Sequence, residues 1–329
     1  MNYRKLGHTD IDVSVVGLGT WAIGGWKWGG TDETDAIAAI RTGIDEGINL
    51  VDTAPAYGFG LAEELIGKAI VGRRDKVVLA SKCGLVWHTD RGEHFFEAEG
   101  HQVHRFLGSE SIRYELEQSL KRMKVDCIDL YQTHWQDATT AIDDTMACLE
   151  KLKDQGKIRA IGVSNCTVGQ LEQYEAAGQL DVDQEEYNMI DRKHEDDLLP
   201  WCREHGTSVL AYSAMALGLL TGKVTLDRTF DEGDMRKGSP RFNQQNRQRV
   251  LDFCEVIRPV ADAHNATIAQ TVIAWTTAQP GVTVALCGAR NPKQATENAA
   301  AGAIELTDTE LKAINESIVR HLDDIPKAW

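Results

Sequence analysis

Eight short segments of this sequence have the pattern of β-strands, and most of them end in a polar residue or a glycine turn. The residues at these ends are Thr20, Asp52, Lys82, His134, Asn165, Asn188, Ser213 and Gly288. A stretch with helical periodicity follows nearly every segment. This alternation predicts an α/β fold, a (β/α)8 TIM barrel of parallel strands, in which one rim carries the chemistry.

The predicted elements can be placed along the chain. We expect barrel strands near 15–20, 48–54, 77–82, 127–135, 158–165, 181–188, 208–214 and 282–289. We expect helices near 34–46, 62–70, 109–122, 141–155, 168–177, 196–205, 246–263, 267–278, from 291 and near 307–320, some of them outside the repeat. A strand–turn–strand pattern at the start predicts an N-terminal β-hairpin that closes the barrel floor. No linker interrupts the pattern, so residues 1–329 are predicted to form one domain.

Two segments depart from the alternation and are expected to be long loops. Residues 85–108 contain four histidines, and residues 215–245 are rich in glycine and charge without a clear period. Loops of this length in a compact domain are usually functional or disordered. The second segment is either a solvated insertion or, as we favour, a lid over a bound cofactor that slows its release.

The overall composition excludes some partners. Lys and Arg total 35 against 50 Asp and Glu, which gives a formal charge of −15. Such an acidic surface disfavours nucleic acid and anionic membranes as partners. The seven cysteines are odd in number and form no CxxC motif, which favours a reducing compartment. With no apolar signal core at the start and no apolar run of 18 residues, the protein is predicted to be cytoplasmic.

Four polar side chains at neighbouring strand ends predict an acid–base group. Asp52, Lys82 and His134 end three successive strands, and Tyr57 lies five residues after Asp52. A free tyrosine has a pKa of about 10, and a lysine cation nearby lowers that pKa by roughly 1–3. Asp52 can hold the ammonium of Lys82, and His134 can hydrogen-bond a carbonyl oxygen. Singly, such residues are more often structural; together they predict proton transfer during reduction of a carbonyl compound.

Reduction also needs a hydride donor, and the rim offers groups that can hold a dinucleotide. The segments GLGTWAIG (17–24) and GLLTGK (218–223) lack the spacing of a Rossmann fingerprint and of a P-loop. Amide, hydroxyl and aromatic side chains can instead hold the nicotinamide, backbone amides the pyrophosphate, and a helix start the remaining phosphate. The predicted contacts are Gly19, Thr20, Trp21, Asp52, Ser164, Asn165, Gln184, Tyr212, Ser213, Ala214, Leu217, Gly218, Leu219, Lys223, Gly288, Arg290, Gln294, Glu297 and Asn298.

Tryptophans are concentrated near the same rim. Aromatic walls exclude water and suit a carbonyl compound or the C–H face of a carbohydrate. The predicted walls of the substrate pocket are Trp21, Trp26, Trp87 and Trp135, although Trp26 can equally be a loop anchor. The histidines of 85–108 do not have the spacing of a zinc site, so no metal is predicted.

The sequence resembles the aldo-keto reductase family over nearly its whole length. The matching segments are GLGTW (17–21), INLVDTAPAYG (48–58), LASKCG (79–84), DLYQTHW (129–135), IRAIGVSN (158–165), QEEYN (184–188), AYSAMALGLLTGK (211–223) and GARNPKQATEN (288–298). The resemblance implies that Tyr57 is the general acid/base, that Lys82 and Asp52 tune it, and that His134 positions the carbonyl. It also implies a nicotinamide cofactor extended across the barrel mouth.

The resemblance further implies NADP(H) in preference to NAD(H), because Arg290 is placed to meet a 2′-phosphate. The matching segments are most similar to those of bacterial members that act on small aldehydes and polyols, such as glycerol and glyceraldehyde dehydrogenases. Some positions depart from the usual pattern: Cys166, Gln136, Ala214 and Cys287. Gln136, Ala214 and Cys287 stand where the family commonly has proline, and Cys166 where it commonly has an aromatic residue. None of them removes a proton-transfer group.

The predicted function is thus an oxidoreductase that interconverts small carbonyl compounds and alcohols as a monomer or weak homo-oligomer. One alternative is a nicotinamide-binding redox sensor with little turnover, as potassium-channel β subunits resemble the same family. A second alternative is a metal-dependent barrel hydrolase.

Overall fold

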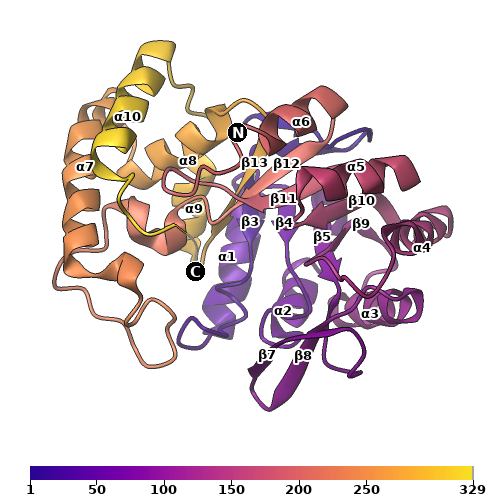
Figure 1. Ribbon diagram of the computed structural model, residues 1–329. Helices are drawn as coiled ribbons and strands as arrows, with labels where there is room; N and C mark the ends of the chain where they lie inside the picture. Colours follow the sequence, from indigo (N-terminus) through magenta and orange to yellow (C-terminus); the bar gives the residue numbers. More distant parts are fainter. Residues whose placement is uncertain (328–329) are drawn as a thin grey trace.

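Eight parallel strands close into a barrel in this computed structural model, which describes residues 1–327 (Figure 1). Around the barrel they are β3 (Val16–Gly19), β4 (Leu50–Asp52), β5 (Val78–Cys83), β9 (Ile128–Thr133), β10 (Ile158–Ser164), β11 (Val182–Glu186), β12 (Ser208–Tyr212) and β13 (Val282–Gly288). Every neighbouring pair is parallel, including β13 with β3. The predicted (β/α)8 barrel is confirmed.

The helices form a layer outside the strands (Figure 1). They are α1 (Glu33–Asp45), α2 (Leu61–Ala69), α3 (Ser109–Met123), α4 (Ile142–Asp154), α5 (Val168–Ala177), α6 (Leu198–His205), α7 (Gln244–Ala263), α8 (Ile268–Ala278), α9 (Pro292–Ala301) and α10 (Asp308–His321). Short 3-10 turns occur at η1 (Arg74–Lys76), η2 (Ala216–Thr221) and η3 (Pro240–Phe242). Helices α7 and α10 pack on each other beside the barrel, outside the repeat. Within residues 1–327 no helix is long and apolar enough to cross a membrane.

The barrel interior changes from apolar at its base to polar at its mouth. Alternate residues of a strand point to the same face, so Leu50 and Leu130 point inward near the base and Asp52 and Gln132 point inward above them. The N-terminal hairpin of β1 (Tyr3–Lys5) and β2 (Asp12–Ser14) closes the base, where Leu6, Ile11 and Val13 join the inner apolar cluster. The predicted hairpin floor is confirmed.

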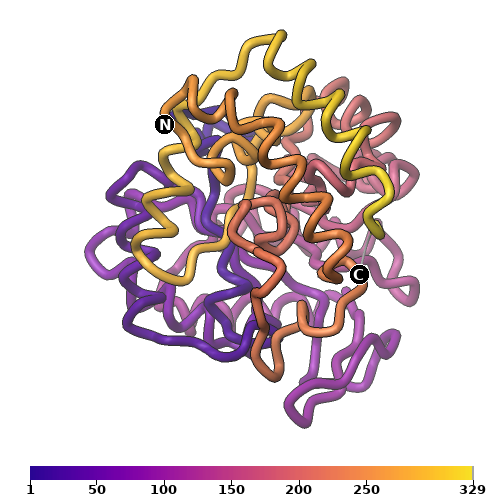
Figure 2. The backbone as a smooth tube through the Cα atoms, turned by 90° about the vertical axis from the view of Figure 1, so that its left-hand side faces the viewer, coloured from indigo at the N-terminus to yellow at the C-terminus, as the bar shows by residue number. Residues whose placement is uncertain are grey.

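The predicted loop at 85–108 is instead a small antiparallel sheet. It consists of β6 (Leu85–Val86), β7 (Glu93–Ala98) and β8 (His101–Arg105). Only Glu99 and Gly100 connect β7 to β8, and both have positive φ, of 50° and 80°, as tight hairpin turns require. Charged and histidine side chains on the exposed face hide the strand alternation in the sequence. The hairpin projects from the lower end of the molecule in Figures 1 and 2.

Candidate active site

The ammonium of Lys82 is the centre of a buried hydrogen-bonded group at the barrel mouth. Lys82 ends β5 with its side chain fully buried, and its Nζ lies 2.7 Å from Asp52 Oδ2, 3.0 Å from the Thr53 carbonyl oxygen and 3.3 Å from Tyr57 Oη. A lysine ammonium has three N–H donors, and three oxygens receive them here. Asp52, Tyr57 and Lys82 are therefore brought together as the sequence predicted.

The carboxylate of Asp52 is held from its other side by two amides. Gln132 Nε2 and Gln184 Nε2 lie 3.2 and 2.9 Å from Asp52 Oδ1. Both glutamines are buried in the lumen, in phase with the inward residues of β9 and β11. A buried charge needs a partner and further hydrogen bonds, and Lys82 with these amides supplies them. The sequence predictions missed Gln132, although its spacing of two from the inward Leu130 places it in the lumen.

Burial sets the protonation states of this group. Burial raises the pKa of the Tyr57 phenol more than the Lys82 cation lowers it, and the Asp52 carboxylate raises it further. The net pKa is therefore above the usual value, and the expected net lowering is corrected, because desolvation disfavours tyrosinate. Burial lowers the pKa of Lys82, yet Asp52 and Tyr57 raise it to a net value above normal. The group therefore holds a neutral phenol beside an ammonium.

His134 lies next to the phenol. Its ring centroid is 5.6 Å from that of Tyr57, with the planes nearly perpendicular. Burial and then the Lys82 cation hold the pKa of His134 well below its usual value, so the imidazole is neutral. The backbone of this residue is fixed on both sides, because its N–H donates to the Cys83 carbonyl oxygen and its own carbonyl accepts from Asn165 Nδ2.

Most of the residues predicted to hold the nicotinamide lie in one network beside this group. Ser164 Oγ donates to the Gln184 carbonyl oxygen at 2.7 Å and accepts from Asn165 Nδ2 at 3.0 Å. Tyr212 Oη donates to Asn165 Oδ1 at 2.9 Å. With Gln184 bound to Asp52, the network is continuous with the acid–base group. Thr20 is less available, because its hydroxyl donates to the Asp52 carbonyl oxygen.

Two glycines that were predicted to contact the cofactor face each other at the rim between β3 and β13. Gly19 and Gly288 lie opposite each other in register, and a Cβ atom added to either would meet nothing nearer than 3.8 Å. Neither strand therefore presents a side chain at this point of the rim, which leaves room for a cofactor to approach the backbone. Beside it, Ala214 is buried and Trp21 borders the mouth.

The backbone after β12 is strained where the pyrophosphate was predicted to bind. Ser213, Ala216 and Leu217 have φ of 58°, 45° and 55°, and Gly218 has φ of 88°. Left-handed conformations of non-glycine residues cost about 1–3 kcal/mol each and gather at ligand sites. Bends of this kind direct successive N–H groups toward anions. Leu219 lies in the same turn, η2, so the chemistry of this segment fits a phosphate.

The residues predicted to contact the adenosine end have other partners in the described structure. Arg290 Nη1 and Nη2 donate to the carbonyl oxygens of Trp28 and Gly30 at 3.1 and 2.6 Å. Glu297 forms an ion pair with Lys223, a residue that was predicted to hold the pyrophosphate instead. Gln294 Oε1 accepts the Arg290 N–H, and Asn298 Nδ2 donates to the Gly288 carbonyl oxygen. All of them lie together on one side of the mouth, and Arg290 joins α9 to the loop after β3.

The predicted aromatic walls lie in two groups. The Trp21 ring stacks on the Tyr57 ring with their centroids 6.4 Å apart, and it contacts the Trp28 ring edge-on with centroids 5.7 Å apart. Trp26, Trp87 and Trp135 instead belong to a cluster with side chains of the β7–β8 hairpin and Phe59. Among residues 1–327, the indole N–H groups of Trp21 and Trp28 are buried without a hydrogen-bond partner. Unsatisfied buried donors are rare, and because both N–H groups are closed off from solvent, the rings would have to shift before either could bind an oxygen atom.

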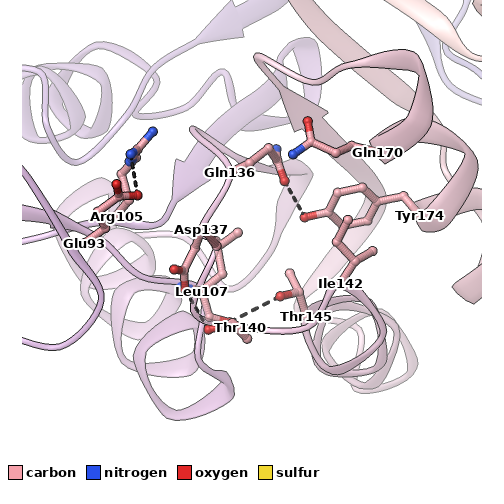
Figure 3. Close-up of a pocket in the computed structure, with 11 residues that line it drawn as sticks. Glu93, Arg105, Leu107, Gln136, Asp137, Thr140, Ile142, Thr145, Gln170 and Tyr174 are labelled. Carbon is pink, nitrogen blue, oxygen red and sulfur yellow. Dashed lines mark hydrogen bonds and ion pairs between the residues drawn. The ribbon is translucent and has the colours of Figure 1, made fainter.

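A cavity of about 240 Å³ lies outside the acid–base group. It is bordered by the loop after β9, by α5 and by the β7–β8 hairpin (Figure 3). Gln136 extends from this loop, where its Oε1 accepts from Tyr174 Oη at 2.8 Å and its Nε2 donates to Thr133 Oγ1 and the Ser164 carbonyl oxygen at 3.1 Å. This side chain thus supports the strand end that carries Ser164. Nowhere in residues 1–327 are three or more His, Cys, Asp or Glu side chains grouped to hold a metal ion.

Several known proteins are similar to this chain in sequence or in fold. The model of the Aldo/keto reductase family matches residues 15–319. The NADH-specific methylglyoxal reductase of Escherichia coli is 40% identical over 322 residues, covering 96% of this chain and 98% of the relative. The glycerol dehydrogenase AKR11B4 from Gluconobacter oxydans matches with a TM-score of 0.88 and 38% identity, covering 99% of this chain and 98% of that one. An aldo/keto reductase from Klebsiella pneumoniae in complex with NADP and acetate has a TM-score of 0.70 and 30% identity, covering 96% and 94%.

The chain belongs to the aldo/keto reductase family. The family consists of oxidoreductases that use nicotinamide cofactors, and the resemblance inferred from the sequence motifs is thus confirmed.

Proposed function

We propose that this protein interconverts small aldehydes or ketones and the corresponding alcohols, with Tyr57 as general acid/base and NADP(H) as the preferred cofactor. The contact of the Lys82 ammonium with both Asp52 and the Tyr57 phenol carries the proposal. The partner is a small carbonyl or alcohol substrate. The seven cysteines are free thiols, which supports a reducing, cytoplasmic setting, and we retain a monomer or weak homo-oligomer as the proposed state.

When bound, the nicotinamide supplies or accepts the hydride. In the reductive direction, Tyr57 Oη donates its proton to the carbonyl oxygen, and the Lys82 ammonium stabilises the tyrosinate that forms. Asp52 keeps the ammonium in place. The neutral imidazole of His134 orients the carbonyl oxygen by a hydrogen bond. In the oxidative direction, the same tyrosine accepts the proton from the alcohol.

Ser164, Asn165 and Gln184 would hold the nicotinamide carboxamide, Tyr212 would face its ring, and the turn 213–219 would hold the pyrophosphate. Arg290 would bind the 2′-phosphate of NADP in place of the two carbonyl oxygens that it now contacts. A relative that is NADH-specific makes this preference the part of the proposal that most needs a test.

Small oxygenated substrates suit the wall beside Tyr57. The indole N–H groups of Trp21 and Trp28 are buried and unpaired, and a small shift of these rings on substrate binding would let them donate to a hydroxyl or second carbonyl next to the reacting one. Polyols, glyceraldehyde-type compounds and related 2-oxoaldehydes have such an oxygen. The glycerol dehydrogenase and methylglyoxal reductase activities in the names of two similar proteins agree with this class.

Residues 215–245 would act as a lid. Asp234 pairs with Trp28 in an antiparallel bridge, and the Met235 N–H donates to the Lys27 carbonyl oxygen at 3.0 Å. The Arg236 guanidinium lies 4.9 Å from the Trp28 ring centroid and donates to the Leu217 carbonyl oxygen. The part of the segment after residue 219 thus joins the turn that would hold the pyrophosphate to the loop after β3. Its opening would precede cofactor release.

The decisive experiment compares steady-state turnover of glyceraldehyde with NADPH by the wild type and Tyr57→Phe. We expect the wild type to cycle repeatedly and the variant to lose about 10²-fold or more in kcat, the scale of general acid catalysis. Cofactor binding, measured by fluorescence titration, should be unchanged. Near-normal turnover by Tyr57→Phe would refute the role of the phenol. A single slow turnover by the wild type would instead favour a redox sensor.

A further inference from the structure

We propose that the β7–β8 hairpin sets the size of substrate that the active site accepts, because Phe95 and Phe96 close the mouth beside Tyr57 and exclude bulky carbonyl compounds. This inference rests on the proposed function and adds a specificity element to it. The hairpin lies in the segment between β5 and α3 and supplies none of the acid–base residues.

The two phenylalanines contact tryptophans that follow two different barrel strands. Phe96 stacks on Trp26 with ring centroids 5.1 Å apart and planes at 20°. Phe95 contacts Trp135 at 5.3 Å. Trp26 follows β3 and Trp135 follows β9, and in the barrel these strands flank β4 and β5. The hairpin therefore spans the arc of rim that carries Asp52, Tyr57, Lys82 and His134.

A local irregularity explains how two adjacent residues can both pack against these tryptophans. In a regular strand, neighbouring side chains point to opposite faces. Here the pairing of β7 with β8 shifts between His94 and Phe96, which pair with His104 and Val103. The shift is a β-bulge at Phe95, and bulges redirect side chains. Accordingly, the rings of Phe95 and Phe96 lie 5.3 Å apart and contact each other.

The hairpin is also attached to the loop that carries the catalytic tyrosine. Phe59, two residues after Tyr57, packs against Trp26 at 6.1 Å, Trp87 at 5.1 Å and His101 of β8 at 4.7 Å. Aromatic pairs contribute about 0.5–1.5 kcal/mol each beyond the burial of their area. Several such pairs hold this wall in place, so a bulky substrate would have to displace it, whereas a small one would not.

The test measures kcat/KM with NADPH for benzaldehyde and for glyceraldehyde in the wild type, Phe95→Ala and Phe96→Ala. Tyr114→Ala on α3, an exposed aromatic residue outside the mouth, is the matched control. We expect Phe96→Ala to raise the benzaldehyde-to-glyceraldehyde ratio by about tenfold or more, within the range by which pocket size discriminates substrates. We expect Phe95→Ala to raise it less and Tyr114→Ala to leave it unchanged. The KM for NADPH should stay constant in all variants.

Phe96→Leu retains apolar bulk and guards against loss of folding in the alanine variant. Its ratio should lie between those of the wild type and Phe96→Ala, with unchanged circular dichroism. If the wild type reduces glyceraldehyde and the ratio stays within twofold in both Phe95→Ala and Phe96→Ala, the hairpin does not select by size. If the wild type reduces no carbonyl compound, the proposed function itself fails, and this inference fails with it.

Discussion

Gly162 of β10 lies directly against Gln132 of β9 inside the barrel. A Cβ atom at residue 162 would lie 2.7 Å from Cγ of Gln132, closer than side-chain atoms can approach. The absence of a side chain on one strand thus gives Gln132 the room from which its amide reaches Asp52 Oδ1.

We therefore expect Gly162→Ala to displace Gln132 and weaken the support of Asp52. Overpacking of a core typically destabilises by about 1–3 kcal/mol, and kcat should fall as well. Urea unfolding and steady-state kinetics measure the two effects. Gly169→Ala on α5, where an added Cβ meets nothing within 4 Å, is the control and should be neutral or slightly stabilising. Equal behaviour of the two variants would contradict the role of Gly162.

The ion pair of Asp52 and Lys82 predicts a non-additive pair of substitutions. Lys82→Met leaves a buried carboxylate without its cation, and breaking such a pair costs about 3–5 kcal/mol. Adding Asp52→Asn removes the orphaned charge and should recover a large part of that loss. Chemical denaturation of the wild type, Lys82→Met, Asp52→Asn and the double variant gives a double-mutant cycle, which measures the coupling free energy between the two side chains. Additive losses would show that the two side chains do not depend on each other.

The carboxyl of Glu115 on α3 predicts how stability depends on pH. Burial raises its pKa from 4.5 to about 8. Hydrogen bonds from the Gly84 N–H and the Ser111 hydroxyl lower the pKa, but by less than burial raises it. Because the folded pKa exceeds the unfolded one, the folded state binds more protons between these values. The free energy of unfolding should therefore fall as the pH rises from about 4.5 to about 8.

Glu115→Gln stays neutral and can still accept from the Gly84 N–H. We expect the variant to be more stable than the wild type at pH 8.5 by at least about 1 kcal/mol, since one pKa unit corresponds to about 1.4 kcal/mol. At pH 4 the two should be nearly equal. Denaturant titrations across this pH range provide the measurement, and parallel curves for the two proteins would argue against a buried proton on Glu115.

Arg290→Ala tests the preference for NADP. Losing a charge-assisted contact worth about 1.5–3 kcal/mol should raise the KM for NADPH by about 10–100-fold and that for NADH much less. Lys312→Ala on α10, a remote loss of one positive charge, serves as the control. An equal loss for both cofactors would point instead to the contacts of Arg290 with Trp28 and Gly30 as its main role.

Much of this arrangement could be predicted from the sequence because strand ends obey simple rules. Asp52, Lys82 and His134 each end a predicted strand, and the carboxyl ends of parallel strands meet at one rim. Their proximity therefore followed from the order of the strands. Gln132 was missed because it lies within its strand, where only the alternation with Leu130 marks it as inward.

Features that depend on burial or on contacts between distant loops were not predictable in the same way. The direction of the Tyr57 pKa depends on how far desolvation outweighs Lys82, and the sequence contains no measure of that balance. The β7–β8 hairpin was hidden because its exposed face carries charge and histidine. Its Glu99–Gly100 turn was the available signal, and Phe96 could be assigned a partner only once Trp26 had a position in space.

The N-terminal hairpin, which closes the base of the barrel, restricts how substrate and cofactor can reach the active site. Leu6, Ile11 and Val13 close the base of the barrel together with the inward apolar side chains of the strands, so substrate and cofactor are expected to enter from the opposite end. Of substrate and cofactor, the one that lies deeper in the barrel mouth would therefore have to bind first and dissociate last. The closed base, which lies far from the reacting atoms, would in this way impose an ordered binding mechanism on each catalytic cycle.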